Sequence, residues 1–333
     1  MSFFDTFCEM LVILFAIAMG YLANRLKIMG GEMDQKVSKL LLYITVPVMS
    51  LGSVTARETL PEIREILSVL CVSAVFYGVE VLFSLTVPRL LGGTPEQKGV
   101  WRYGMMFPNV GFIGYPVVVT LFGQDALFYA VVLALPFNML SYSLGPLMLT
   151  GAKRFDWKQL CSPCVVSSLV ALILALVRVQ MPPIVGETLN FVGDMTVPLS
   201  LILVGSLLAG LPVKQVFSSF RLWILSALRL FAVPALLALV LRGMDVSPLV
   251  KGVAIVQAAM PMAVNGSMLC LEYGGDTECM AQATFITTLA SILSIPVVAA
   301  ILLYVLKFCS LEVEYDASDS TVGAPCGGPD RRG

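Results

Sequence analysis

The stretch Phe107-Pro-Asn-Val-Gly-Phe-Ile-Gly-Tyr-Pro116 decides the fold, because it interrupts an apolar segment that is otherwise long enough to cross a membrane. Each Pro removes a backbone donor and clashes with the preceding helical turn, and the two Gly and the Asn weaken the helix further. Backbone groups that are freed at membrane depth must line a water-filled cavity or be buried in protein. The stretch therefore predicts a broken helix that carries a polar site inside the membrane.

A second apolar segment is interrupted in the same manner by Gln257-Ala-Ala-Met-Pro-Met-Ala-Val-Asn-Gly-Ser267. Two broken helices at corresponding positions in the two halves of a chain are typical of binding sites in secondary transporters. The half-helices begin with unpaired N–H groups and partial positive charge, which suit a carboxylate. We therefore expect the two helices to cross near the middle of the membrane and to bind an anion there.

The candidate substrate-binding residues come from these two stretches and from one further span. They are Pro108, Asn109, Gly111, Gly114, Asn138, Gln257, Pro261, Asn265 and Ser267. Asn138 stands apart, since a lone Asn inside the membrane is as often a contact between helices as a ligand. The alternative for the Pro and Gly residues is that they only kink helices for packing. Their occurrence as a matched pair favours a binding site.

The composition indicates a membrane protein with little acid–base chemistry. Of the 333 residues, 58% are hydrophobic and 13% are charged, against about 25% charged residues in an average soluble domain. The absence of His excludes a Ser-His-Asp triad, a zinc site with His ligands and a His proton relay. The net charge of −1 does not suggest a nucleic acid partner. We expect neither an enzyme nor a resident metal or cofactor, and we interpret Cys161-Ser-Pro-Cys164 as two small apolar residues beside a span.

Ten segments are apolar over the ~20 residues that a spanning helix needs. They cover residues 7–26, 37–55, 63–87, 99–122, 126–150, 160–180, 189–211, 222–241, 250–271 and 280–306. Lys and Arg are more frequent in the loops after odd-numbered spans, which predicts that these loops face the cytoplasm and that both termini lie outside it. Residues 310–333 are polar and cannot bury enough apolar surface to fold, so we expect a disordered tail there.

Three short strings recur in the same order at one separation of 151 residues. The pairs are Thr45-Val-Pro47 with Thr196-Val-Pro198, Leu60-Pro61 with Leu211-Pro212, and Gly123-x-Asp125 with Gly274-x-Asp276. The repeat unit holds five spans, and an odd number of spans inverts the second copy in the membrane. The chain is therefore predicted to be an all-α polytopic membrane protein with one five-helix repeat over residues 1–151 and an inverted one over 152–309.

Two charged residues lie deep within predicted spans, Glu80 in the third and Arg229 in the eighth. A charge in hydrocarbon costs ~2.5–3.5 kcal/mol even on the gentler insertion scale, so such residues usually have a role. One hypothesis is that Glu80 titrates and couples proton movement to transport, while Arg229 compensates charge or attracts an anion. The alternative is that one or both form a structural contact or reach the membrane surface.

The two broken stretches resemble motifs of the auxin efflux carrier family. The resemblance rests on Pro108-Asn-Val-Gly-Phe-Ile-Gly-Tyr-Pro116 and on Ala259-Met-Pro-Met-Ala-Val-Asn265, which is followed by Glu272-Tyr-Gly-Gly-Asp276. It implies two inverted five-helix repeats, arranged as a scaffold and a transport domain whose fourth and ninth spans cross, as in sodium–bile acid symporters. The family moves small organic acids, indole-3-acetate in plants and malate or malonate in bacterial relatives. The short loop over residues 151–158 resembles prokaryotic members, which lack the long central loop.

The resemblance also implies roles for individual residues. Pro108 with Asn109, and Pro261 with Asn265, match the crossing motifs that are expected to contact substrate. Asn138 matches a polar position near that site, and Glu80 is similar to an acidic residue that plant members carry in the third span.

The leading interpretation is a secondary transporter in the cell membrane that moves a small organic anion by alternating access at the crossing. The second is a sodium-coupled organic anion symporter of the bile-acid type, which needs acidic and carbonyl ligands around the crossing. The two stretches offer Asn, Gln and Ser there but no carboxylate. Two alternatives do not involve transport: an intramembrane sensor or enzyme, and a purely structural membrane protein. Protons, the lipid bilayer and a second copy of the chain in a homodimer are the further partners considered.

Overall fold

The computed structural model describes residues 3–55, 62–150, 163–179, 181–210 and 219–319, and this part of the chain is all-helical apart from one isolated β-bridge. The first half contains α1 (Phe3–Arg25), α2 (Gly31–Leu40), η1 (Leu41–Thr45), α3 (Val46–Thr55), α4 (Ile63–Leu91), α5 (Pro95–Met106), η2 (Val110–Gly114), α6 (Tyr115–Phe122), α7 (Asp125–Leu133) and α8 (Leu135–Thr150). The second contains α9 (Pro163–Val177), α10 (Pro183–Gly193), α11 (Thr196–Ala209), α13 (Phe220–Ala227), η4 (Leu228–Ala232), α14 (Val233–Arg242), α15 (Pro248–Ala258), α16 (Asn265–Tyr273) and α17 (Thr277–Asp319).

Several of these helices have the length and apolar character of membrane spans. Among the described residues, five continuous helical stretches qualify, namely Gly31–Thr55, Ile63–Leu91, Pro183–Ala209, Phe220–Arg242 and Thr277–Ile301. Shorter apolar helices cover Val110–Phe122, Pro163–Val177 and Pro248–Ala258. The protein is therefore a polytopic all-α membrane protein, as its composition predicts. The predicted tail from residue 310 begins within α17, and residues 320–333 lie outside the described residues, so the tail stays a prediction.

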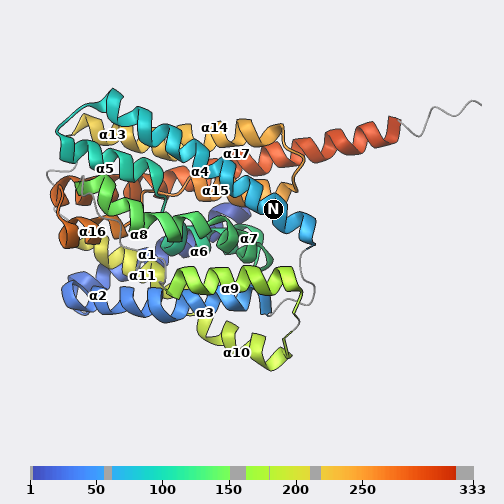
Figure 1. Cartoon of the computed structure of the whole chain (residues 1–333), viewed down its shortest axis with the longest axis horizontal. Helices are drawn as coiled ribbons and strands as arrows, with labels where there is room; N and C mark the ends of the chain where they lie inside the picture. The colour runs from blue at the N-terminus through green and yellow to red at the C-terminus, as the bar shows by residue number, and fades with distance from the viewer. Residues whose placement is uncertain (1–2, 56–61, 151–162, 180, 211–218, 320–333) are drawn as a thin grey trace, which may run out of the picture.

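The helices pack in two groups. Figure 1 shows α3, α9 and α10 of the first group on one side of the molecule and α4, α13 and α14 of the second on the other, with α1 and α11 nearer the middle. In the first group, α1 packs along α11, and α3 packs on α9 and α10. In the second, α4 packs on α5 and α14, α13 on α17, and α14 on α15. Helices α6, α7 and α8 contact both groups, so the broken segment between α5 and α6 lies near the middle of the molecule.

The first group is held together by an unusually close crossing of α1 and α11. A Cβ atom on Gly20 would lie 1.9 Å from the carbonyl oxygen of Ile202, and one on Gly205 would lie 1.9 Å from the carbonyl oxygen of Ile17. Only Gly therefore allows the two backbones to touch, which is the usual role of small residues between membrane helices. Beyond this crossing, the side chain of Asn24 donates to the Ser206 hydroxyl at 3.0 Å, so polar contacts continue the packing.

Three described segments are π-helical, and each ends two residues before a Pro. The segments η1, η2 and η4 are followed by Pro47, Pro116 and Pro234. Pro cannot donate to the carbonyl of an earlier turn, and a π-bulge accommodates the mismatch. In η1 the Val46 N–H donates to the Leu41 carbonyl, so the next donor in that register would be the missing N–H of Pro47. The thiol of Cys164 donates to the carbonyl left over, that of Leu42, at 3.0 Å.

Candidate functional site

The two predicted helix breaks lie against each other. Pro108 and Met262 form an isolated antiparallel bridge. The Asn109 N–H donates to the Pro261 carbonyl at 2.7 Å, and the Ala263 N–H donates to the Phe107 carbonyl at 2.9 Å. Each break therefore satisfies backbone groups that the other would leave unpaired in a dry interior. The structure thus brings together the two stretches that the sequence singles out.

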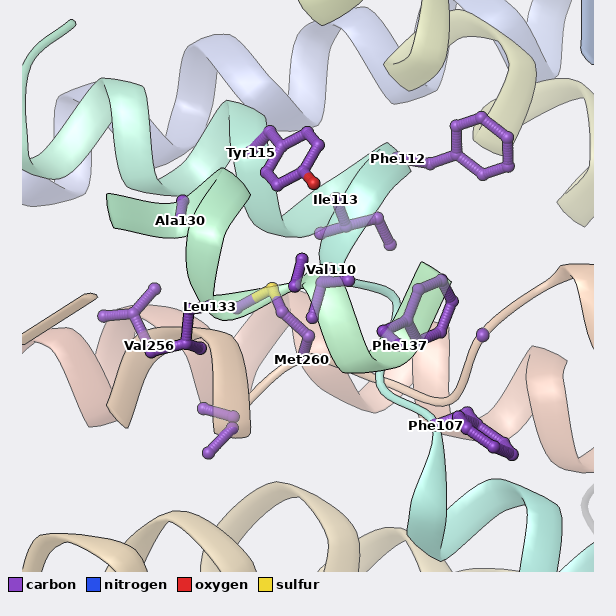
Figure 2. Packing of buried hydrophobic residues seen from close by; sticks show 14 of the residues in the cluster. Phe107, Val110, Phe112, Ile113, Tyr115, Ala130, Leu133, Phe137, Val256 and Met260 are labelled. Atoms are coloured by element: carbon purple, nitrogen blue, oxygen red, sulfur yellow. The ribbon is translucent and has the colours of Figure 1, made fainter. Parts of the chain in front are cut away.

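Apolar side chains of the two breaks and of α7 pack around this crossing. Figure 2 shows Phe107, Val110 and Ile113 from the first break packed in one cluster with Leu133 of α7 and Met260 of the second break. All of these residues are buried. Their close packing holds the backbone of both breaks in place and excludes water from most of the crossing.

Asn109 occupies the start of the second half of the first broken helix. Its Oδ1 accepts a hydrogen bond from the Phe112 N–H at 3.2 Å, so the side chain caps the following π-helical segment. The residue is only 3% exposed, yet its Nδ2 has no hydrogen-bond partner. A buried amide donor without a partner costs about 1–3 kcal/mol. An acceptor that enters the site would remove this cost.

Asn265 holds the corresponding place in the second broken helix, but its amide is already engaged. Its Oδ1 accepts from the Tyr103 hydroxyl at 2.9 Å, and its Nδ2 donates to the Ser141 hydroxyl at 3.3 Å. Tyr103 belongs to α5 and Ser141 to α8, so Asn265 ties three helices together. The two asparagines therefore differ in their hydrogen bonding, although each lies where the second half of a broken helix begins.

A small cavity of about 40 Å³ lies beside the crossing. It is lined by Leu42, Val46, Asn109, Gly111, Phe112, Tyr115, Phe137, Cys164 and Asn265. A Cβ atom on Gly111 would meet nothing within 4 Å, so this Gly leaves space next to the asparagines. The volume holds a few water molecules but is far below the ~300 Å³ or more of ordinary ligand pockets. A larger ligand therefore requires the surrounding helices to separate.

The other predicted site residues take different places around the crossing. Pro108 and Pro261 form the breaks, and the Gly114 N–H donates to the Asn109 carbonyl at 2.9 Å. Gln257 is buried and donates to the Ala130 carbonyl at 3.3 Å, while its Oε1 has no partner. Ser267 lies on α16 outside the cavity lining. The side chain of Asn138 lies outside the described residues.

Glu80 and Arg229 form an ion pair in which both side chains are completely buried. Both terminal nitrogens of the guanidinium donate to the carboxylate oxygens, one of them at 3.0 Å. Arg229 also donates to three backbone carbonyls, those of Met105, Ala258 and Met260, at 3.0, 3.0 and 3.1 Å. The pair therefore links α4 and η4 to the ends of α5 and α15, next to the breaks.

Sequence reasoning missed several residues of this site. Tyr103, Ser141, Phe137 and Cys164 come from apolar spans and stand in no motif that marks them as polar partners. Cys164 is a weak exception, because its CxxC spacing draws attention, although the structure uses it as a hydrogen-bond donor to Leu42. Among the residues that the structure describes, no group of three or more Cys, Asp and Glu side chains could hold a metal ion.

A second cavity, of about 280 Å³, lies away from the crossing. It is lined by the first turns of α5, α13 and α17, including Gln97, Arg221 and Glu278, and by none of the predicted site residues. Its mixture of opposite charges does not favour an anion. The crossing therefore remains the candidate site.

Comparison with known proteins gives one family and several relatives. The family model described as "Membrane transport protein" matches residues 5–156 and again residues 148–299. An uncharacterized transporter of Methanocaldococcus jannaschii is 25% identical over 304 residues, which cover 88% of this chain and 97% of the relative. An uncharacterized transporter of Methanothermobacter thermautotrophicus is 23% identical over 311 residues, which cover 91% of this chain and 100% of the relative. A protein of Rhizobium meliloti named "Putative malonate transporter" is 23% identical over 295 residues, covering 84% and 90%.

Proposed function

This chain belongs to the membrane transport protein family, and from that premise we propose that it is a secondary transporter of small organic acid anions. The family match confirms the resemblance to auxin efflux carriers that the broken-helix motifs indicate. In this proposal the anion binds at the crossing of the two broken helices. The site opens alternately to the two sides of the cell membrane.

The observation that carries the proposal is the free amide of Asn109. Its Nδ2 is buried without a partner, and the residue lines the cavity beside the crossing. The start of the second half-helix contributes partial positive charge at the same place. A carboxylate is the acceptor that best suits an amide donor next to a helix N-terminus.

The proposed architecture is ten spans in two inverted repeats over residues 1–151 and 152–309. Support comes from the strings that recur at a separation of 151 residues, and from a family model that matches each half of the chain. The excess of Lys and Arg in the loops after odd-numbered spans supports a cytoplasmic position for these loops. Both termini would then lie outside the cytoplasm.

The proposed substrates are small carboxylates such as malonate and malate, with auxin-like acids as larger candidates. The name of the Rhizobium meliloti relative supports malonate as the first compound to test. Arg229 supplies no free donor to such an anion, because its N–H groups already bind Glu80 and three carbonyls. Amide groups and half-helix ends would hold the substrate instead.

Sodium coupling is the second candidate function, favoured by one observation. The Oε1 of Gln257 is buried without a partner, and an amide oxygen is a suitable ligand for a hard cation. Sodium-independent uptake would exclude this candidate.

The function is tested by uptake into vesicles that contain only lipid and the purified protein. Radiolabelled malonate, malate and indole-3-acetate are offered at two pH values, with and without sodium. We expect saturable uptake of at least one acid, weakened in Asn109→Ala and in Asn265→Ala. The absence of uptake for every acid would reject the transporter for this substrate class. Unchanged binding of a confirmed substrate in both variants would reject the crossing as its site.

Proton coupling through Glu80 has its own test, the pH dependence of uptake in Glu80→Gln. Because Arg229 engages both carboxylate oxygens, we favour charge compensation as the role of the pair. The pH profile of uptake should then keep its shape in this variant, although the rate falls. A profile that becomes flat would instead assign proton coupling to Glu80.

A further inference from the structure

Arg229 uses every donor of its side chain. A guanidinium has five N–H groups, and in this structure two bind Glu80 while the others bind the carbonyls of Met105, Ala258 and Met260. The residue is completely buried and lies on the π-helical segment η4. A buried guanidinium whose five N–H groups are all hydrogen-bonded is held in one position, which indicates that it fixes the groups around it.

The three carbonyls share a structural position. Met105 lies in the last turn of α5, Ala258 is the last residue of α15, and Met260 lies within the second break. The last carbonyls of a helix have no partner in their own helix, and they form the negative end of the helix dipole. Arg229 therefore caps the first half of both broken helices with one positive charge.

Glu80 supplies the negative charge that balances the guanidinium of Arg229. A lone guanidinium in a dry interior is costly, and a bonded carboxylate removes most of that cost. Glu80 comes from α4, whereas Arg229 comes from η4, 149 residues further along the chain. The pair is thus neutral and connects the two halves of the chain at the crossing. Neither residue lines the cavity next to Asn109.

We propose that Arg229, with Glu80 as its counter-ion, is the positioning residue of the crossing and does not bind the transported anion. It fixes the ends of α5 and α15, which in turn places Asn109 and Asn265 at the cavity. The inference rests on the proposed function only in taking that cavity as the substrate site.

The test measures hydrogen–deuterium exchange of the full chain in lipid nanodiscs, together with malonate uptake. The peptides of interest contain the bridging amides of Asn109 and Ala263, and peptides from α1 and α11 serve as the internal control. Arg229→Lys keeps the charge but has too few donors for all five contacts. We expect its bridging amides to exchange about tenfold faster or more, because several hydrogen bonds to a charged group are lost. The α1 and α11 peptides should keep their slow exchange, and the KM for malonate should rise more than kcat falls.

A charge swap, Glu80→Arg with Arg229→Glu, separates this role from that of a simple ion pair. The swap restores opposite charges but turns a carboxylate toward three carbonyls, so we expect it to rescue neither exchange nor uptake. Rescue by the swap, or slow exchange of the bridging amides in Arg229→Lys, would overturn the proposal. If Arg229→Lys or the charge swap exchanges fast in every peptide, the measurement is repeated with Glu80→Gln. We again expect fast exchange to be confined to the peptides of the two breaks.

The exchange data stand independently of the substrate. If the unaltered protein does not transport malonate, the proposed function fails for that acid. Exchange at the breaks still decides the role of Arg229.

Discussion

At the scale of single residues, the asparagines that begin the second halves of the two broken helices have different hydrogen-bond partners. The Asn109 Oδ1 caps the π-helical segment, and its Nδ2 has no hydrogen-bond partner. The Asn265 Oδ1 accepts from Tyr103, and its Nδ2 donates to Ser141. We infer that Asn109 contacts the substrate directly and that Asn265 mainly holds the second half-helix in place. In the proposed inverted repeat the two asparagines belong to similar half-sites, and their different neighbours account for their different hydrogen bonds.

Asn109→Asp tests the free nitrogen with little change in shape. The new carboxylate still accepts from the Phe112 N–H, but an oxygen replaces the donor that faces the cavity. We expect affinity for malonate to fall roughly 10- to 100-fold, since a hydrogen bond to a charged group is lost. Isothermal calorimetry or the KM of uptake measures this change. Gln124→Glu, the same amide-to-acid exchange at an exposed loop position, should bind malonate normally. Equal affinity in both variants would contradict the role of Asn109.

At the scale of elements, prolines create carbonyls that side chains from distant helices must satisfy. Pro47 leaves the Leu42 carbonyl without its π-helical donor, and the thiol of Cys164 takes that place. Arg229 serves the broken helices in a similar way. At η1 and at the two breaks, helices that are remote in sequence therefore supply donors to the irregular backbone.

Cys164 can be tested by two substitutions of similar size. Cys164→Ala leaves the Leu42 carbonyl unsatisfied, and we expect a loss of about 1 kcal/mol of stability. Cys164→Ser keeps a hydroxyl donor, so its melting temperature should stay closer to that of the unaltered protein. Thermal unfolding in detergent, followed by intrinsic fluorescence, compares the two. A larger loss in the Ser variant than in the Ala variant would show that the hydrogen bond is unimportant.

The crossing of α1 and α11 predicts strict intolerance at Gly205. A Cβ atom there would approach the Ile17 carbonyl oxygen to 1.9 Å, so Gly205→Ala must push the two backbones apart. We expect a loss of about 3 kcal/mol, the upper end of the usual cost of overpacking, seen as a lower melting temperature and a poor yield of monodisperse protein. Gly210→Ala, whose Cβ would lie 3.6 Å from its nearest neighbour, is the matched control on the same segment. A Gly205→Ala protein as stable as this control would contradict the close crossing.

At the scale of the whole molecule, the proposed inverted arrangement predicts which loops face which side of the membrane. Arg64 lies at the start of the third proposed span and Lys98 follows the end of the same span, so their side chains should face opposite sides of the membrane. In a variant without native cysteines, a membrane-impermeant maleimide should label Arg64→Cys in intact cells and should label Lys98→Cys only after the cells are opened. Labelling of both positions from outside would reject the proposed topology.

The sequence by itself determined the parts of this protein that depend on local chemistry. Proline, glycine and asparagine within Phe107–Pro116 forbid a straight helix whatever surrounds them, and apolar length identifies the membrane segments. The recurring strings and the family motifs likewise follow from the order of residues along the chain. These features can be read from the sequence because each depends on short strings of residues and on their order along the chain, and not on which side chains meet in the fold.

Only the tertiary structure decided which groups meet across those windows. The bond from Tyr103 to Asn265 joins residues 162 apart, and that from Cys164 to Leu42 joins residues 122 apart. From the sequence, Glu80 and Arg229 are two isolated charges with either a transport or a structural role. In the fold they form one buried ion pair without net charge. The physical reason is that a buried donor without an acceptor costs free energy, so most buried donors bond to groups that the fold brings close, and no periodic pattern along the chain records which acceptor that will be.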